Sequence, residues 1–535
     1  MAEIISHNSN GPRPLPEPTT ELVRNFYETP ALTEEKGCQI GVPSEVGKAA
    51  FYYEKIRNAV DYQDEHLLLK NAIARIMRRK LTKKIESDKI TEELVCELAW
   101  ARYIKNDSLS QTKLTKISYL ITKYKTIYKT TRSLKYHRSQ IYDFLIGPIS
   151  CEIEETIVSH QKEEALVDFA KKVIIKQVQI PSDNVDPRIQ DIQLEIAIRR
   201  CLLKADTDRI EYRLLQCYFP KWSETHTIPE IGKNYDWLYD NIQSQLSHPL
   251  AEKVNKYIKK NGPPFQVIWG MIKDLKNAKE ATELLQDERR VIDRIEGIAR
   301  NNYTEAKRKV LRGVVRGIAF ILLTKLVLAL ILELPYDLFF VGHINYLALG
   351  MNILIPPFLM LIAGIFIKVP GKENTMRLDN ATRSVIYSGT LGSPPFSITR
   401  KKHSKLYFIF DTILGLVSIA ILSSLVWLLV SIHFNIVSML LFFFFLSIVS
   451  FLSVRIRGIA RELEMKQPEE NFWEISIGLL FLPFVRIGHW LSSRFSKYNV
   501  LIFILDFMIE APLKTLIAVA ESWIAFVREK REDLE

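Results

Sequence analysis

The stretch GIAFILLTKLVLALILELPYDLFF, residues 317–340, decides the fold class of this chain. Gly317–Leu334 is almost continuously apolar, and about 20 apolar residues suffice to cross a hydrocarbon core of about 30 Å. Lys325 lies in the middle of the stretch and Glu333 near its end. The stretch therefore predicts a transmembrane helix that carries a charge near the membrane midplane.

Three similar apolar runs follow the first one. Together the four runs cover about 314–334, 344–367, 406–432 and 436–454. Backbone polar groups in lipid must be satisfied within their own segment, so continuous apolar runs of this length are helices. The sequence predicts an all-α fold with a four-span transmembrane domain at 311–460, which includes a polar connection at 368–405.

Basic residues are distributed unevenly over the connections between the spans. PYDLFFVGH (335–343) and HFN (433–435) contain no Lys or Arg, whereas 368–405 contains eight. Basic connections stay on the cytoplasmic side of a membrane. We therefore expect a multi-pass protein of a bacterial inner (plasma) membrane, with both termini in the cytoplasm and two short hairpins outside.

Residues 1–310 are much more polar than the spans. The run PRPLPEP within 1–45 predicts a disordered, Pro-containing leader. In 46–310 the segment LTKISYLITKYKTIYK repeats apolar residues at intervals of three and four, which is typical of an amphipathic helix. Similar spacing elsewhere in 46–310 predicts a cytoplasmic, multi-helix domain.

The last part of the chain, 461–535, is apolar but less regular. ISIGLLFLPFV (475–485) is too short to span a bilayer. Further on, polar residues fall on one narrow helical stripe: Asp506, Glu510, Lys514, Glu521 and Arg528. This pattern predicts amphipathic interfacial or re-entrant helices and a cytoplasmic tail, although a fifth and a sixth span are also compatible with it.

Motifs for catalysis or cofactor binding are not found. The chain contains no phosphate-binding glycine loop, no H-E-x-x-H and no G-x-S-x-G, and its five cysteines lack zinc spacing. We therefore predict that the protein is not an enzyme and holds no cofactor or metal.

Lys325 is the clearest candidate for a functional residue. It lies too deep for its side chain to reach the interface, so it needs a partner inside the bundle. Asp411 in the third span is one candidate, because side chains lean toward the N-terminus of a helix and both residues enter from the cytoplasmic side. The other candidate is an acceptor-rich helix break at Asn352, Pro356 and Pro357. Glu333 and Asp337 are expected at the outer edge, close to water.

Two interpretations of these charges remain open. Intramembrane charges and broken helices form ion sites in transporters, whereas a buried ion pair can also fix helix packing alone. The leading hypothesis is a non-enzymatic scaffold or anchor, in which the helical domain binds an unknown cytoplasmic protein. The alternative is an ion or small-solute transport component with its site at Lys325 and Asp411, for which a homo-oligomer could supply further helices.

A basic stretch at 102–138 gives a third hypothesis. Its candidate surface residues are Lys113, Lys116, Lys123, Lys125, Lys129, Arg132, Lys135 and Arg138. Basic residues interleaved with tyrosines suit anionic lipid headgroups or single-stranded nucleic acid. Tyr124 and Tyr128 lie on the apolar helix face and are expected in the core. Anionic lipid is therefore the favoured ligand, and nucleic acid is not expected.

Some segments resemble known proteins. LPFVRIGHWLSSRFSKYNVLIFILDFMIEAPLK (482–514), WIAFVREKRE (523–532) and HRSQIYDFLIGPISCEIEE (137–155) resemble segments of uncharacterised multi-pass membrane proteins from small-genome bacteria. That resemblance implies a membrane protein and no particular activity. The layout of a helical domain before four spans is also similar to the chloroplast and cyanobacterial proton-extrusion family, which implies the transport alternative.

Overall fold

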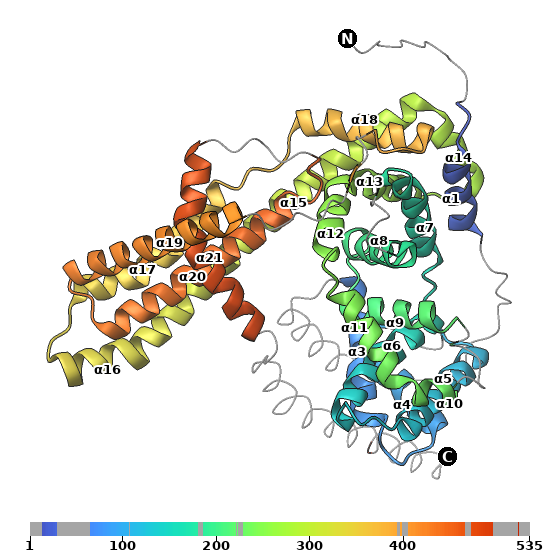
Figure 1. Cartoon of the computed structure of the whole chain (residues 1–535), viewed down its shortest axis with the longest axis horizontal. Coiled ribbons are helices and arrows are strands. Elements are labelled where there is room, and N and C mark those ends of the chain that lie inside the picture. The colour runs from blue at the N-terminus through green and yellow to red at the C-terminus, as the bar shows by residue number, and fades with distance from the viewer. Residues whose placement is uncertain are drawn as a thin grey trace, which may run out of the picture. The chain divides into compact units, whose positions relative to one another are not determined.

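The computed structural model is helical nearly throughout the residues that it describes (Figure 1). It describes 13–28, 65–105, 108–179, 186–220, 222, 228–392, 396–397, 405–465, 472–495 and 523. Two short segments, β1 (Val178–Gln179) and β2 (Phe396–Ser397), pair in parallel. The predicted all-α class is confirmed, because this pairing is too short to form a sheet of its own.

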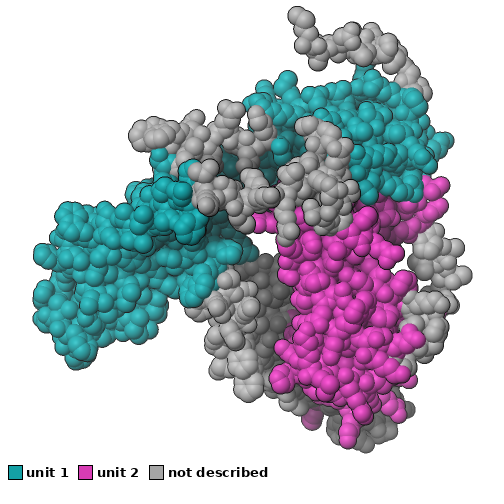
Figure 2. Space-filling view, viewed as in Figure 1, with its two compact units in different colours: residues 1–23, 172–184, 259–498 teal, residues 24–171, 185–258, 499–535 magenta. Residues whose placement is uncertain are grey.

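The chain divides into two compact units (Figure 2). Unit 1 contains 1–23, 172–184 and 259–498, and unit 2 contains 24–171, 185–258 and 499–535. The helices from residue 259 onward belong to the same unit as the spans, so these two units do not follow the predicted division at residue 310. These helices share the unit of the spans because they pack on the long first span and on the connection between the second and third spans.

Unit 2 is a helical domain with its own apolar core. Its helices are α3 (Leu68–Lys80), α4 (Ser87–Trp100), α5 (Gln111–Thr130), α6 (Arg138–Ile157), α8 (Pro187–Leu202), α9 (Thr207–Tyr218), α10 (Ile228–Lys233) and α11 (Tyr235–Leu246), after the 3₁₀ turn η1 (Glu65–Leu67). Helix α6 is central, since α3, α5 and α9 all pack against it. Ile117, Leu120 and Ile121 of α5 are buried, which confirms the amphipathic helix predicted there.

Two helices, α7 (Gln161–Ile175) and α12 (Ala251–Asn261), end beyond the limits of unit 2. Unit 1 continues with α13 (Pro263–Ile272), α14 (Ala278–Gln286) and α18 (Lys372–Ser388), the helix between the second and third spans. Helix α18 packs on α13 and on the first span. The expected disordered leader is wrong for α1 (Glu17–Tyr27), where the Thr19 hydroxyl donates to the Ile386 carbonyl of α18.

Among the described residues, four helices are long and apolar enough to cross a membrane, as predicted. The first is α15 (Glu288–Leu328) with its extensions η3 (Ala329–Glu333), α16 (Leu334–Tyr336) and η4 (Asp337–Val341). The others are α17 (Tyr346–Ile365), α19 (Lys405–Ser431) and α20 (Ile436–Ala460). The length and composition of these four helices fit a membrane protein.

Glycines allow the spans to approach closely. A Cβ at Gly364 of α17 would lie 2.7 Å from the Val314 side chain of α15, and one at Gly317 would lie 3.0 Å from Met360. Small residues at such crossings let membrane helices pack by van der Waals contact. A similar close approach occurs between α20 and α21 (Phe472–Phe495), where a Cβ at Gly488 would clash with the backbone oxygen of Ser447.

Helix α21 is longer than the apolar run that predicts it. It extends through Pro483 and packs on α20 and α19, with its ends projecting to either side of these spans in Figure 1. Its described apolar part, Gly478–Leu491, is shorter than a span. The polar stripe predicted between Asp506 and Arg528 lies outside the described residues.

Candidate intramembrane site

Lys325 of α15 is fully buried in the helix bundle. Its Nζ lies 3.1 Å from Oε1 of Glu333, and neither side chain has exposed surface. The ammonium also lies 5.0 Å from the centre of the Phe445 ring of α20, a cation–π contact that gains strength away from water. Lys325 is thus a desolvated cation whose charge is balanced by a carboxylate of the same span.

Asn352 of α17 joins this ion pair to two further helices. Its Nδ2 donates to Glu333 Oε1 over 2.5 Å and to the Ser438 carbonyl oxygen of α20 over 3.2 Å. Asn352 and Ser438 are also buried. The first, second and fourth spans therefore meet at one polar centre.

Two oxygen atoms at this centre have no hydrogen-bond partner among the described residues. They are Glu333 Oε2 and Asn352 Oδ1, and both are buried. The Ser438 side chain of α20 also lies near the Glu333 carboxylate. An unsatisfied buried acceptor is costly, so such atoms usually bind a water molecule or an ion. Carboxylate and amide oxygens are the ligands that hard cations prefer.

Asp337 extends the polar row toward one end of the bundle. It is 5% exposed and accepts a hydrogen bond from Nδ2 of Asn435, the residue before α20. Lys325, Glu333 and Asp337 are separated by eight and four residues, a spacing that keeps them near one helix face. This face thus presents two carboxylates and one ammonium to the bundle interior.

The helix changes its geometry where the carboxylates lie. Glu333 ends the π-helical segment η3, and Asp337 begins the second one, η4. Pro335 between them has no N–H, so it cannot donate to the Ile331 carbonyl as an α-helix requires. Wider π turns accommodate such a defect, and they occur frequently at functional sites.

The expected pairing of Lys325 with Asp411 is wrong. Asp411 is exposed on α19, and no contact within the described residues joins it to Lys325. Lys325 instead reaches in the C-terminal direction to Glu333, about 12 Å further along an α-helix at 1.5 Å per residue. The usual lean of side chains toward the N-terminus is overridden because a buried ammonium needs a counter-charge more than it needs a common rotamer.

The second expected partner of Lys325, the helix break at Asn352, Pro356 and Pro357, is found only in part. Asn352 does lie at the site, through its contact with Glu333. The helix break expected at Pro356 and Pro357 is not found: both are buried inside α17, which continues from Tyr346 to Ile365. Neighbouring helices can support a proline within a membrane helix, so the chain need not unwind there.

Glu333 and Asp337 were also expected to lie close to water, and this part of the expectation is wrong, since both side chains are buried. The sequence did indicate that Glu333 and Asp337 share a helix face with Lys325. Lys325, Ala329, Glu333 and Asp337 recur every four residues, and such a row lies along one side of a helix. The buried serines and Phe445 of α20 carry no comparable signal.

The basic residues of the third hypothesis do not form one surface. Lys123 is buried, with Nζ 2.9 Å from Glu152 Oε1 and 4.5 Å from the centre of the Trp222 ring. Tyr124 Oη and Trp222 Nε1 also donate to Glu152, each over 3.0 Å. Burial lowers the pKa of Lys123, although Glu152 opposes this change. Lys123 is therefore part of the core and is wrongly included among the candidate surface residues.

The other seven basic residues differ in their surroundings. Lys113 and Lys125 are half-buried and donate to backbone carbonyls. Lys135 pairs with Asp240 at 2.7 Å, and Arg138 lies over the Tyr128 ring at 4.7 Å. Exposed positions are held by Lys116, Lys129, Arg132, Lys135 and Arg138. Tyr124 is buried, as expected, and Tyr128 packs against the same core.

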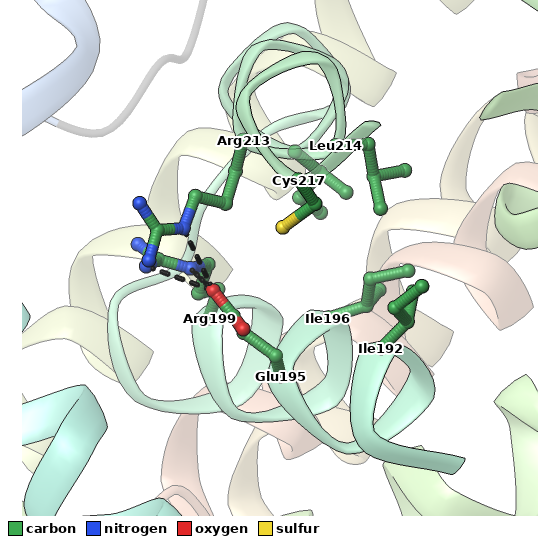
Figure 3. Close-up of a pocket in the computed structure, with 8 residues that line it drawn as sticks. Ile192, Glu195, Ile196, Arg199, Arg213, Leu214 and Cys217 are labelled. Atoms are coloured by element: carbon green, nitrogen blue, oxygen red, sulfur yellow. Dashed lines mark hydrogen bonds and ion pairs between the residues drawn. The ribbon is translucent and has the colours of Figure 1, made fainter. Parts of the chain in front are cut away.

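Unit 2 also contains a small pocket between α8 and α9 (Figure 3). Its lining residues are Ile192, Glu195, Ile196, Arg199, Ile210, Arg213, Leu214 and Cys217. Burial alone would raise the pKa of Glu195, but Arg199 and Arg213 lower it to about 2. Burial raises the pKa of the Cys217 thiol, which keeps it protonated and weakly nucleophilic. The pocket therefore holds paired charges and no activated nucleophile.

Comparisons with known proteins identify no relative. No family model matches the chain, and no curated protein and no solved structure matches it significantly.

Proposed function

We propose that this chain is a transport component for a small cation, with its site at Lys325, Glu333 and Asn352. The observation that carries the proposal is the excess of carboxylate on the buried face of the first span: Glu333 pairs with Lys325, while Asp337, also buried, meets Asn435 and, among the described residues, no cation. An ion pair that only holds helices together needs neither the second carboxylate nor two unsatisfied oxygens. Intramembrane ionisable groups that face a bundle interior commonly mark ion pathways.

The geometry supports a competition between Lys325 and the transported cation. With the 3.1 Å ion pair formed, the Glu333 carboxylate is neutralised by the protein itself. A cation that reaches Glu333 Oε2 and Asn352 Oδ1 takes over this role and releases the Lys325 side chain. Two mutually exclusive partners for one carboxylate give two states, which alternating access requires.

The orientation in the membrane is part of the proposal. The basic residues of 368–405 favour the cytoplasm, so the helical unit and both termini would lie on the cytoplasmic side of a bacterial inner membrane. Asp337 and Asn435 would then lie at the outer end of the pathway. Transport requires a continuous route, and a homo-oligomer would supply further helices to the sparsely covered α19.

Reconstitution tests the proposal. The full chain is inserted into liposomes, and proton, sodium and potassium fluxes are followed with ion-sensitive dyes. Glu333→Gln removes the central carboxylate with little change in size, so it should abolish a flux that the unaltered chain supports. Because it also leaves Lys325 buried without its counter-charge, its assembly is checked by gel filtration before reconstitution. Glu373→Gln is the matched control, because Glu373 has a 79% exposed side chain on α18. Equal flux through both variants would refute the proposal.

A second candidate function is a membrane-anchored interaction module. It is supported by the apolar core that lies wholly within unit 2, since a domain with its own core can present a surface independently of the spans. Affinity purification of the full chain from native membranes tests this candidate. Stoichiometric recovery of a cytoplasmic protein would support it.

A further inference from the structure

The connection between α5 and α6, residues 131–137, holds a leucine completely in solvent. Leu134 has 107% of its reference surface exposed, the largest fraction among the exposed large apolar residues of the described chain. A single exposed apolar side chain is ordinary on a protein surface. The backbone on both sides of Leu134, however, is held by contacts that keep this side chain in solvent.

Hydrogen bonds fix the backbone on both sides of Leu134. The Ser133 hydroxyl accepts from the backbone N–H of Lys135 over 3.1 Å and of Tyr136 over 2.8 Å. Thr131, which is buried, donates its hydroxyl to the Ile127 carbonyl over 2.7 Å. Serine and threonine turns of this kind define a short loop without help from apolar burial. Leu134 therefore stands at the tip of an ordered turn.

Aromatic and charged contacts anchor the turn to α11. The Tyr136 ring packs against Tyr239 with centroids 4.6 Å apart, and its hydroxyl donates to Asp240. Lys135 Nζ lies 2.7 Å from the same carboxylate. Lys135 is thus held against α11, while the Leu134 side chain points into solvent.

The end of unit 2 that carries this turn is basic. Arg138 donates to the Tyr128 and Thr131 carbonyls, and the Tyr142 hydroxyl donates to the Arg78 carbonyl at the end of α3. These contacts bring Arg78 and Arg138 to the end of α5 that also carries Lys129, Arg132 and Lys135. Asp143 and Asp240 pair with two of them, Arg78 and Lys135. The exposed leucine is thus surrounded by an excess of positive charge.

We propose that the Leu134 turn docks on an anionic bilayer surface, with Leu134 inserted among the headgroups and Lys129 and Arg132 on lipid phosphates. A cationic rim around an apolar tip fits the two layers of such a surface, because basic residues attract anionic lipid while an aliphatic side chain gains from burial in the acyl boundary. Nucleic acid fits less well, since it is bound by stacking on aromatic rings, and the tyrosines here are packed against each other.

Hydrogen exchange with mass spectrometry tests this docking on the full chain in lipid nanodiscs. Peptides that cover 131–138 should exchange more slowly in discs that contain anionic lipid than in zwitterionic discs. Because each basic residue near an anionic surface contributes about fivefold in affinity, Lys129→Gln/Arg132→Gln should reduce the protected fraction strongly, and high salt should do the same. Leu134→Asp should abolish the protection.

Lys116→Gln is the matched control, since it removes an exposed charge from the other end of α5, and it should leave the protection unchanged. Exchange in α6, which is buried, reports whether each variant stays folded. Equal exchange of 131–138 in anionic and zwitterionic discs would overturn the proposal. Protection that is independent of lipid charge but lost on dilution of the discs would also overturn it, in favour of a second protein on this surface.

Discussion

Lys325 Nζ and Glu333 Oε1 lie 3.1 Å apart in one span, and both side chains are completely buried. The pair closes over eight residues of the same helix, which an α-helix alone would place about 12 Å apart. The long lysine side chain and the π-helical turn at Glu333 make the contact possible. Asn352 then ties the pair to the neighbouring spans.

The effects of replacing Lys325 and Glu333 on the stability of the bundle should be strongly coupled. Lys325→Met leaves Glu333 buried without its counter-charge, and Glu333→Gln does the same to Lys325, so each should destabilise the bundle by about 3–5 kcal/mol. The double variant removes both charges and keeps an amide oxygen for Asn352, so it should be close to the unaltered chain. Thermal unfolding in detergent micelles measures all three. Additive losses in the double variant would show that the two charges are not paired.

Crossing of the first two spans at Gly364 gives a packing prediction. Gly364→Ala places a Cβ 2.7 Å from Val314, and overpacking of this kind costs about 1–3 kcal/mol. Gly350→Ala is the control on the same helix, because a Cβ there meets nothing within 4 Å. It should be neutral or more stable by up to about 1 kcal/mol, since alanine favours helix. Unfolding midpoints of the two variants in one detergent decide between these outcomes; equal midpoints would contradict the close crossing.

The membrane architecture was predictable because lipid imposes a simple rule. Spans in lipid must be helical and apolar, so apolar runs alone locate α15, α17, α19 and α20. The partner of Lys325 was not predictable in the same way. The choice between Asp411 and Glu333 depends on which helix faces turn inward, and a continuously apolar span gives little periodicity from which to read a face. The four-residue row from Lys325 to Asp337 was informative, but Pro335 suggested an end to the helix where the chain instead continues through π turns.

Lys123 illustrates the same difficulty in the helical unit. Lysine is seldom fully buried, so the burial of Lys123 follows only from its tertiary contacts with Glu152 and Trp222. The opposite holds for α5 as a whole, where the regular spacing of Ile117, Leu120 and Ile121 was sufficient to predict the buried face.

Removal of Lys123 should therefore be costly. Lys123→Met leaves the buried Glu152 without its cation and should destabilise unit 2 by about 3 kcal/mol or more. Lys116→Met is the control on the same helix, where exposed substitutions change stability by about 0.5 kcal/mol at most. Tryptophan fluorescence during chemical unfolding of the full chain follows both. Equal effects would mean that Lys123 is a surface residue after all.

Stability of the helical unit should depend on pH through Glu211. Burial raises the pKa of Glu211 from its ordinary value of 4.5 to about 7, and nearby Asp206 and Asp208 act in the same direction. The folded chain therefore binds a proton that the unfolded chain releases, so this group's contribution is fully present below about pH 4.5 and is lost as the pH rises through 7.

Glu211→Gln keeps an acceptor for the Gln243 side chain, which donates to Glu211 over 3.0 Å, but it cannot ionise. The variant should match the unaltered chain at pH 5 and be more stable at pH 8, as measured by unfolding midpoints at both pH values. Glu252→Gln, at an exposed carboxylate, controls for charge removal alone. A gain in stability that is equal at pH 5 and pH 8 would contradict a buried, protonated Glu211.

The most direct test of the transport account uses the double variant Lys325→Met/Glu333→Gln in liposomes. Because the variant removes both buried charges together, it should remain folded, and its assembly is checked by gel filtration before reconstitution. Cation flux through this folded variant should be lost, while the Glu373→Gln control retains it. Undiminished flux through the double variant would contradict the account and leave the Lys325–Glu333 pair with a purely structural role.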